Sequence, residues 1–261
     1  MSREPADWPS KRVIITAAAT GIGLVIAKSF HALGAKVWIS DIAADKLEEA
    51  MAAMPGCGGM LCDVAKPDQV DAFVAAATKA MGGLDILINN AGIAGPALPL
   101  EEITTEQWEQ VMAVNVNGQF FAARACIPHL KAAGGGSIVC LASVAGKYAF
   151  ALRSPYSTSK AAVIALARTL SVELGPFKIR VNAIAPGAVS GDRINRVLTD
   201  RAKTRGISYA EMEAIALKAV SLKTMVDPEE IADLILFLCA PTGRAITGQL
   251  HSICGGLEYT E

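Results

Sequence analysis

The stretch VIITAAATGIG, residues Val13–Gly23, joins a short β-branched run to a turn of small residues. Val, Ile and Thr favour an extended strand, and the following Gly21–Leu33 has the pattern of a helix. Small side chains let the backbone approach a ligand closely, and the free N–H groups of a helix N-terminus attract an anion. The stretch therefore predicts a pyrophosphate-binding turn, with close packing of strand and helix as the alternative.

The same alternation of short apolar strands and longer helical runs continues to the end of the chain. The predicted strands are Val13–Thr16, Lys36–Ser40, Gly59–Cys62, Leu84–Asn89, Ser137–Ala142, Ile179–Ala185 and Gln249–Ile253. The predicted helical runs are Gly21–Leu33, Ala43–Met54, Pro67–Met81, Thr104–Lys131, Pro155–Gly175, Arg193–Leu222 and Pro228–Leu238. Near-continuous Val/Ile/Leu strands separated by helices are typical of a parallel sheet covered on both faces. We expect an α/β fold of the Rossmann type: a doubly wound, seven-stranded parallel sheet flanked by helices.

The domain organisation is predicted to be simple. No linker rich in Pro, Gly or Ser, no repeat and no shift in composition divides the 261 residues, so we expect one domain over residues 1–261. The polar segment 190–222 is the part that resembles an insertion, and we expect it to form a lid over the substrate.

Composition excludes several classes of protein. The 25 acidic and 24 basic side chains leave a net charge of −1, which argues against a nucleic-acid partner. Hydrophobic residues make up 52% of the chain, yet uncharged stretches such as residues 86–100 reach 15 residues, whereas a membrane-spanning helix needs about 20. The polar N-terminus, MSREPADWPSKR, has no apolar signal core. We expect no membrane partner and a soluble cytoplasmic protein.

Cysteine and histidine are too scattered to predict a metal site. The six cysteines form no CxxC pair, and the chain has only three histidines. We expect no metal and free thiols in a reducing compartment. The cysteines are Cys57, Cys62, Cys126, Cys140, Cys239 and Cys254.

Asp41 ends the second predicted strand, eighteen residues after Gly23. In a dinucleotide-binding fold, a carboxylate at this place accepts hydrogen bonds from the adenosine ribose and repels a 2′-phosphate. No Arg or Lys lies in residues 17–23 to hold such a phosphate, so the sequence favours NAD(H) over NADP(H). The alternative is that Asp41 caps the following helix.

Tyr156 and Lys160 are four residues apart at the start of a predicted helix and therefore lie on one face. A phenol with an ordinary pKa of about 10 is a weak base, but an adjacent ammonium group favours the phenolate. Bringing such a pKa to about 7 requires roughly 4 kcal/mol of differential stabilisation. The alternative is an ordinary Tyr–Lys helix pair.

These motifs together resemble the classical short-chain dehydrogenase/reductase family over nearly the whole chain. The cofactor loop Thr16-xxxx-Gly21-x-Gly23 and the segment Asn89-Asn90-Ala91-Gly92 match in order and spacing. The match extends to Asn115, to Ser143 thirteen residues before Tyr156, and to the segment from Asn182 through Pro186-Gly187.

The resemblance implies a role for each catalytic residue. Tyr156 would be the general acid/base, Ser143 would hydrogen-bond the substrate oxygen, and Lys160 would lower the pKa of the phenol and hold the nicotinamide ribose. Asn115 would order a water that links Lys160 to solvent. The implied cofactor-binding residues are Thr16, Thr20, Gly21, Ile22, Gly23, Asp41, Asp63, Val64, Asn90, Ala91, Gly92, Tyr156, Lys160, Pro186, Gly187 and Val189.

The chain departs from the family pattern at two positions. Ala17 stands where the first glycine of the loop is usual, which bears on cofactor affinity rather than on chemistry. Gly191 stands where a threonine is frequent, and the neighbouring Ser190 is a candidate substitute for binding the carboxamide. The resemblance also implies a homotetramer, with a homodimer as the alternative.

The expected function is that of an NAD(H)-dependent oxidoreductase interconverting a small secondary alcohol and its ketone. A ketoacyl reductase or epimerase-type relative is one alternative, and a non-catalytic NAD-binding protein is another. Basic residues such as Lys147, Arg153 and Arg193 raise the hypothesis that the substrate is anionic, although a solvated helix face is the favoured explanation of them. Tyr148 and Phe150 are candidate apolar walls of the pocket.

Overall fold

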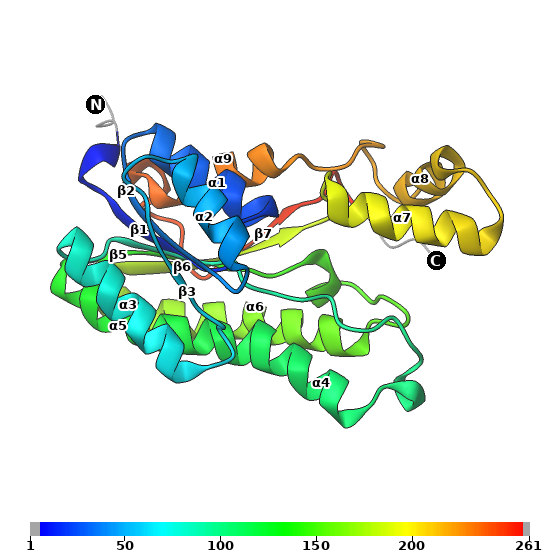
Figure 1. Cartoon of the computed structure of the whole chain (residues 1–261), viewed down its shortest axis with the longest axis horizontal. Coiled ribbons are helices and arrows are strands. Elements are labelled where there is room, and N and C mark those ends of the chain that lie inside the picture. The colour runs from blue at the N-terminus through cyan, green and yellow to red at the C-terminus, as the bar shows by residue number, and fades with distance from the viewer. Residues whose placement is uncertain (1–5, 258–261) are drawn as a thin grey trace.

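The structure is a computed structural model and describes residues 6–257. Its seven parallel strands form one sheet in the order β3-β2-β1-β4-β5-β6-β7 (Figure 1). The strands are β1 (Arg12–Ile15), β2 (Lys36–Asp41), β3 (Gly58–Leu61), β4 (Ile86–Asn89), β5 (Gly136–Leu141), β6 (Ile179–Pro186) and β7 (Leu250–Ile253). The α-helices of the described residues are α1 (Gly21–Ala32), α2 (Ala44–Ala52), α3 (Pro67–Met81), α4 (Thr105–Met112), α5 (Gly118–Ala132), α6 (Ser154–Leu174), α7 (Asp192–Arg205), α8 (Tyr209–Leu217) and α9 (Pro228–Cys239).

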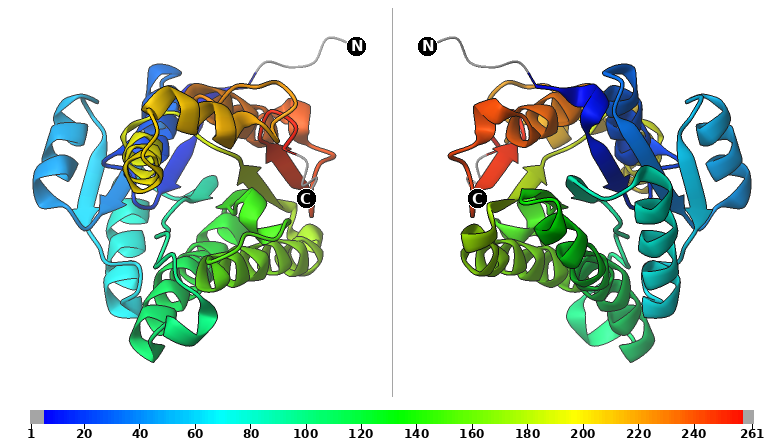
Figure 2. Two further views of the ribbon diagram at one scale, coloured as in Figure 1. Left: turned by 90° about the vertical axis from the view of Figure 1, so that its right-hand side faces the viewer. Right: turned by 90° about the vertical axis from the view of Figure 1, so that its left-hand side faces the viewer.

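Helices cover both faces of the sheet, as the sequence predicts. Helices α1, α2 and α9 pack on one face, and α3, α5 and α6 pack on the other (Figures 1 and 2). Phe30 of α1 and Phe73 of α3 lie in the two opposite layers, and both are fully buried. Burial of apolar surface on both sides explains why the strands are apolar throughout rather than alternating.

The strand order reverses next to β1. β1 pairs in parallel with β2 on one side and with β4 on the other, so the chain crosses the sheet between β3 and β4. In an open parallel sheet, ligands bind outside the carboxyl ends of the strands at such a reversal. The fold therefore places the ligand crevice beside the loops that follow Ile15 and Asn89.

The predicted helix Thr104–Lys131 is present, but it contains a π-helical turn at Ala113–Asn117, which lies between α4 and α5. A π turn contains one more residue than an α turn and is frequent at functional sites. Here the turn contains Asn115, whose fully buried side chain bonds to the backbone of Ile93 outside the helix.

The predicted helical run Arg193–Leu222 is also interrupted. Gly206, with a φ of +65°, ends α7, and a capping box between Ser208 and Glu211 begins α8. Leu198 of α7 and Met212 of α8 are buried in a small apolar cluster of their own. The two helices lie together at the end of the molecule where β6 finishes (Figure 1).

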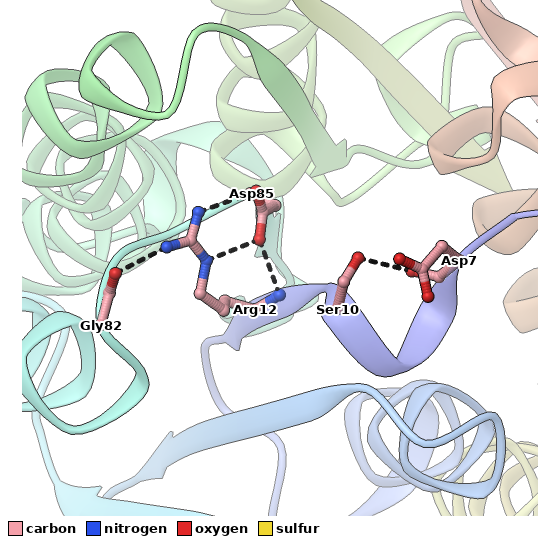
Figure 3. Close-up of polar contacts among 5 residues, drawn as sticks. All are labelled: Asp7, Ser10, Arg12, Gly82 and Asp85. Carbon is pink, nitrogen blue, oxygen red and sulfur yellow. Dashed lines mark hydrogen bonds and ion pairs between the residues drawn. The ribbon is translucent and has the colours of Figure 1, made fainter.

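Arg12, the first residue of β1, forms an ion pair with Asp85, the residue before β4 (Figure 3). The pair lies at the amino ends of these two strands, whereas the ligand crevice lies at their carboxyl ends. Arg12 Nε donates to Asp85 Oδ2 at 2.7 Å, Nη2 donates to Oδ1 at 3.0 Å, and Nη1 donates to the Gly82 carbonyl at 2.6 Å. Burial alone would raise the pKa of Asp85, but hydrogen bonds from Arg12 and its positive charge outweigh burial and lower it.

Three further observations concern the described part of the chain. None of its helices is long and apolar enough to cross a membrane. No group of three or more His, Cys, Asp or Glu side chains within residues 6–257 could hold a metal ion. All six cysteines lie in this range and are unpaired, and burial raises the pKa of Cys57 and Cys62 to about 11 and that of Cys140 to about 12.

Candidate active site

The loop after β1 has the form of an anion-binding turn. Thr20 precedes α1 without a capping bond from its side chain, so the first N–H groups of the helix are not capped by it. Gly23 is required sterically, because a Cβ there would lie 2.5 Å from the Ala17 carbonyl. Gly21 has a φ of +56°, and a Cβ at this residue would have no atom within 4 Å other than those of its chain neighbours. The backbone of the turn is therefore open enough for a pyrophosphate to approach it closely.

Ala17 adopts a left-handed conformation, with a φ of +51°. This backbone conformation costs an L-residue other than glycine roughly 1–2 kcal/mol. The departure from the family pattern is therefore accommodated by strain at one residue.

Thr16 and Asn90 join the loops that follow β1 and β4. Thr16 Oγ1 accepts hydrogen bonds from the N–H groups of Asn90 at 3.1 Å and Ala91 at 3.2 Å. Asn90 Nδ2 donates to the carbonyls of Thr16 at 3.0 Å and Ala17 at 2.7 Å. The Asn90 side chain thus holds the loop in place beneath the crevice.

Asp41 serves the loop and the turn after β2. Its Oδ2 accepts from the Ala19 N–H at 3.0 Å, and its Oδ1 accepts from the N–H groups of Ile42 at 2.8 Å and Ala43 at 3.2 Å. The side chain remains partly exposed at the carboxyl end of the sheet. Asp41 does not cap α2, whose N-cap residue is Ala43 and has no side-chain capping bond, so its place at the end of β2 remains the one expected for ribose binding.

Asp63 and Val64 follow β3 at the same end of the sheet. Asp63 Oδ1 accepts from the Ala65 N–H at 2.9 Å. Val64 is buried against Gly118, where a Cβ would lie 2.8 Å from a Val64 methyl carbon. These contacts fix the turn that contains Asp63 and Val64, two of the cofactor-binding residues implied by the family resemblance.

Tyr156 and Lys160 lie on one face of α6, as their spacing predicts. Lys160 Nζ is 5.8 Å from the centroid of the Tyr156 ring, and the lysine is only 4% exposed. Its ammonium donates to the Leu141 carbonyl at the end of β5 at 2.7 Å. A Cβ at Gly92 would lie 3.0 Å from Nζ, so the segment after β4 passes directly beside the ammonium.

Asn115 is a clamp between three segments. Its Oδ1 accepts from the Ile93 N–H at 2.7 Å, and its Nδ2 donates to the Ile93 carbonyl and to Ser159 Oγ, both at 2.9 Å. Ser159 Oγ in turn donates to the Tyr156 carbonyl at 2.7 Å. Sequence reasoning missed Ser159, although its place one residue before Lys160 was a signal that could have found it.

Ser143 follows β5 and is buried. Its Oγ accepts from the Ala145 N–H at 3.2 Å and thereby caps the short turn Val144–Gly146. A hydroxyl that accepts such a bond can still donate its own hydrogen to another oxygen.

The segment after β6 is held by the C-terminal part of the sheet. Beyond Pro186, the last residue of β6, the Gly187 N–H donates to the Ile253 carbonyl at 2.9 Å, and Val189 pairs with Val226. The Ser190 hydroxyl donates to Asp227 Oδ1 at 2.6 Å, so its oxygen secures the start of α9. Asp227 therefore competes with a carboxamide for the Ser190 hydroxyl.

Asn182 has a structural position inside β6. It is fully buried, its Nδ2 donates to the Ile246 carbonyl at 2.9 Å, and its Oδ1 accepts from the Gln249 N–H at 3.1 Å. It connects β6 to the segment that leads into β7.

The candidate substrate residues lie around the carboxyl ends of β6 and β7. Tyr148 and Phe150 pack against the buried cluster of Val144, Ala185 and Cys254. Lys147 Nζ lies 4.8 Å from the centroid of the Tyr148 ring and 3.5 Å from Ser252 Oγ. Lys147 and Tyr148 line a groove of about 470 Å³. Phe150 is not among the residues that line it.

Of the two arginines of the anionic-substrate hypothesis, Arg153 is not among the residues that line this groove. The backbone of Arg153 precedes α6 as its N-terminal cap residue. The side chain of Arg193 lies outside the described part of the structure.

A family model described as enoyl-(acyl carrier protein) reductase matches residues 16–258. Galactitol 2-dehydrogenase of Agrobacterium fabrum is 38% identical over 249 residues, covering 95% of this chain and 97% of that protein. Dehydrogenase/reductase SDR family member 4 of Oryctolagus cuniculus is 32% identical over 251 residues, covering 95% and 93%. The D-beta-hydroxybutyrate dehydrogenase of Rhizobium meliloti is 32% identical over 254 residues, covering 95% and 98%.

Among solved structures, that of NAD⁺-bound xylitol dehydrogenase superposes with a TM-score of 0.91 at 28% identity, covering 96% of this chain and 100% of that one. The fold, the ordered motifs and these matches over nearly the full length agree. The chain belongs to the short-chain dehydrogenase/reductase family.

Proposed function

We propose that the protein is an NAD(H)-dependent oxidoreductase that interconverts a secondary alcohol and its ketone. The observation that carries the proposal is the buried Lys160 ammonium, 5.8 Å from the Tyr156 ring and beside the crevice segment at Gly92. The similarity to galactitol, hydroxybutyrate and xylitol dehydrogenases supports an alcohol as the substrate class.

Three side chains would divide the proton chemistry at the substrate oxygen. In alcohol oxidation, the Tyr156 phenolate would remove the hydroxyl proton while the Ser143 hydroxyl donates a hydrogen bond to the same oxygen. The positive charge of Lys160 would favour the phenolate. NAD supplies the hydride acceptor when it is bound.

The residues of the crevice fit a dinucleotide. The N–H groups of the first turn of α1, which Thr20 does not cap, would hold the pyrophosphate. Asp41, partly exposed at the end of β2, would accept from the adenosine ribose and repel a 2′-phosphate. The segments Asp63–Val64, Asn90–Gly92 and Pro186–Val189 would line the remainder of the site.

The test is nicotinamide absorbance with NAD and a panel of sugar alcohols and hydroxy acids. Tyr156→Phe should abolish turnover while the NAD dissociation constant stays within about twofold, because the phenol oxygen is removed and the ring is kept. Thr78→Val is the control, since it also removes one hydroxyl and the buried Thr78 hydroxyl donates to the Val74 carbonyl within α3. NAD binding without turnover of any substrate would instead favour the non-catalytic alternative.

We also propose that the protein assembles as a homotetramer that uses α4, α5 and α6 in one interface. Exposed apolar side chains on these helices support this, with Phe120 of α5 45% and Val172 of α6 78% exposed. Sedimentation equilibrium would give the mass of the assembly, and a monomeric mass would contradict the proposal.

A further inference from the structure

We propose that Gln119 is a positioning residue for Lys160 and acts through the Leu141 carbonyl that both side chains share. This inference rests on the proposed function of the Tyr156–Lys160 pair. Gln119 belongs to the first turn of α5 and is fully buried. The motifs that identify the family do not include it.

The shared carbonyl is the central observation. Gln119 Nε2 donates to the Leu141 oxygen at 3.2 Å, and Lys160 Nζ donates to the same oxygen at 2.7 Å. A carbonyl oxygen has two lone pairs, and here two side chains from different helices use them at the end of β5. Gln119 therefore helps to fix the atom that holds the catalytic ammonium.

The main chain around this carbonyl explains why side chains occupy it. Beyond β4, the N–H groups of Asn90 and Ala91 donate to Thr16 Oγ1 instead of toward β5. The end of β5 is thereby left to partners from α5 and α6. A buried ammonium needs such an acceptor, because an unpaired charge in the interior is costly.

The amide of Gln119 is present at a cost. Its Oε1, like Oδ1 of the neighbouring Asn89, is buried without a hydrogen-bond partner among the described residues. Leucine or methionine would fill a similar volume without leaving such an acceptor unpaired. The donor on Nε2 is thus the part of the side chain that an apolar residue could not supply.

Sharing the carbonyl also affects the charge felt by Tyr156. With Gln119 donating to the Leu141 oxygen, that oxygen neutralises less of the Lys160 charge, and its position is fixed. Without Gln119, the carbonyl is free to move and binds the ammonium alone. Both changes reduce the stabilisation that the ammonium gives to a phenolate at Tyr156. Removal of the proton from the phenol should therefore require a higher pH.

The experiment measures the pH profile of kcat for alcohol oxidation in Gln119→Leu, with Gln119→Met as a second variant of flexible shape. We expect kcat at pH 7 to fall about threefold to tenfold, the effect of one net hydrogen bond, and to recover at higher pH. Thr78→Val is the matched control, since the bonds of the buried Thr78 hydroxyl within residues 6–257 go to carbonyls of its own helix. Its profile should coincide with that of the wild type.

A second measurement does not depend on turnover. Ultraviolet titration of each protein, with the Tyr156→Phe spectrum subtracted, follows ionisation of this one phenol, and we expect Gln119→Leu to shift it to higher pH. Unshifted profiles and titrations in folded Gln119→Leu or Gln119→Met would overturn the inference. If the wild type turns over no alcohol but the titration still shifts in Gln119→Leu, the proposed function is overturned instead, and the role of Gln119 remains supported.

Discussion

Asn115 Nδ2 and Ser159 Oγ lie 2.9 Å apart in the interior, and both residues are fully buried. This bond ties the π-helical turn between α4 and α5 to the first turns of α6. Because Ser159 Oγ also donates to the Tyr156 carbonyl, the position of the candidate acid/base depends on an asparagine more than forty residues earlier.

Ser159→Ala should lower kcat about fivefold to tenfold, because the Asn115 amide loses one partner in a buried site where a lost bond costs about 1–2 kcal/mol. The NAD dissociation constant should change little, since Ser159 lies beneath the crevice. Steady-state kinetics and a binding titration separate the two effects. Ser157→Ala is the control, because the Ser157 hydroxyl has no partner among the described residues. Equal loss in both variants would contradict the prediction.

Ala17→Gly should raise the free energy of unfolding by about 0.5–1 kcal/mol. Relief of the left-handed strain at a φ of +51° exceeds the extra entropy that glycine gives the unfolded chain. Ala18→Gly is the matched control; Ala18 is buried and has no positive φ, so this change should lower stability by about 1 kcal/mol. Urea denaturation measures both, and a change of the same sign in the two variants would disprove the strain at Ala17.

Asp85→Asn should lower the free energy of unfolding at pH 7 by about 2 kcal/mol, because it removes the negative charge and one of the two acceptor oxygens of a partly buried, bidentate Arg12 pair. The pKa of Asp85 is lowered in the folded state, so its stabilisation is complete above the unfolded value of about 3.9. The stabilisation is lost as the pH falls through the folded value.

Denaturation curves between pH 7 and pH 3 test this dependence, and the difference in stability between the wild type and Asp85→Asn should narrow toward the acidic end. Asp71→Asn serves as the control, since the Asp71–Arg124 pair is 3.4 Å long and half exposed. It should alter stability by less than about 0.5 kcal/mol at any pH. A constant gap between wild type and Asp85→Asn down to pH 3 would show that the pair contributes through packing alone.

Asp41→Asn should lower kcat/KM for NAD about tenfold and should reduce the preference for NAD over NADP, because it removes the negative charge and the acceptor for the Ala19 N–H. The ratio of kcat/KM for the two cofactors is the measurement. Asp45→Asn, an exposed change in the first turn of α2, should leave that ratio unaltered. An unchanged ratio in Asp41→Asn would limit the role of Asp41 to holding the loop at Ala19 and the turn at Ile42 and Ala43.

Much of the fold could be predicted because its determinants are local. β-branched runs, helix-period runs and small residues at turns each specify their own element, and the spacing of Tyr156 and Lys160 already places them on one helix face. The patterns of Cys, Pro and Gly can likewise be interpreted from the sequence without knowing which distant segments meet in the fold.

The remaining features depend on partners far away in the chain. The π turn at Ala113–Asn117 leaves the apolar pattern of the helix almost unchanged, and its Asn115 bonds to Ile93, a residue more than twenty positions earlier. The bond from Ser190 to Asp227 and the orientation of Gln119 toward Leu141 likewise join segments that only the folded chain brings together.

The pairing of β1 with β4 has a consequence for biosynthesis. A nascent chain emerges from the ribosome with its amino end first, so the small-residue loop is made long before the segment that it contacts. Thr16 can accept its hydrogen bonds only after Asn90 and Ala91 have been translated. A further seventy residues must then be translated before Lys160 reaches the same place. Cofactor added during synthesis therefore cannot act as an early folding template, and should favour only chains in which more than half of the polypeptide has been made.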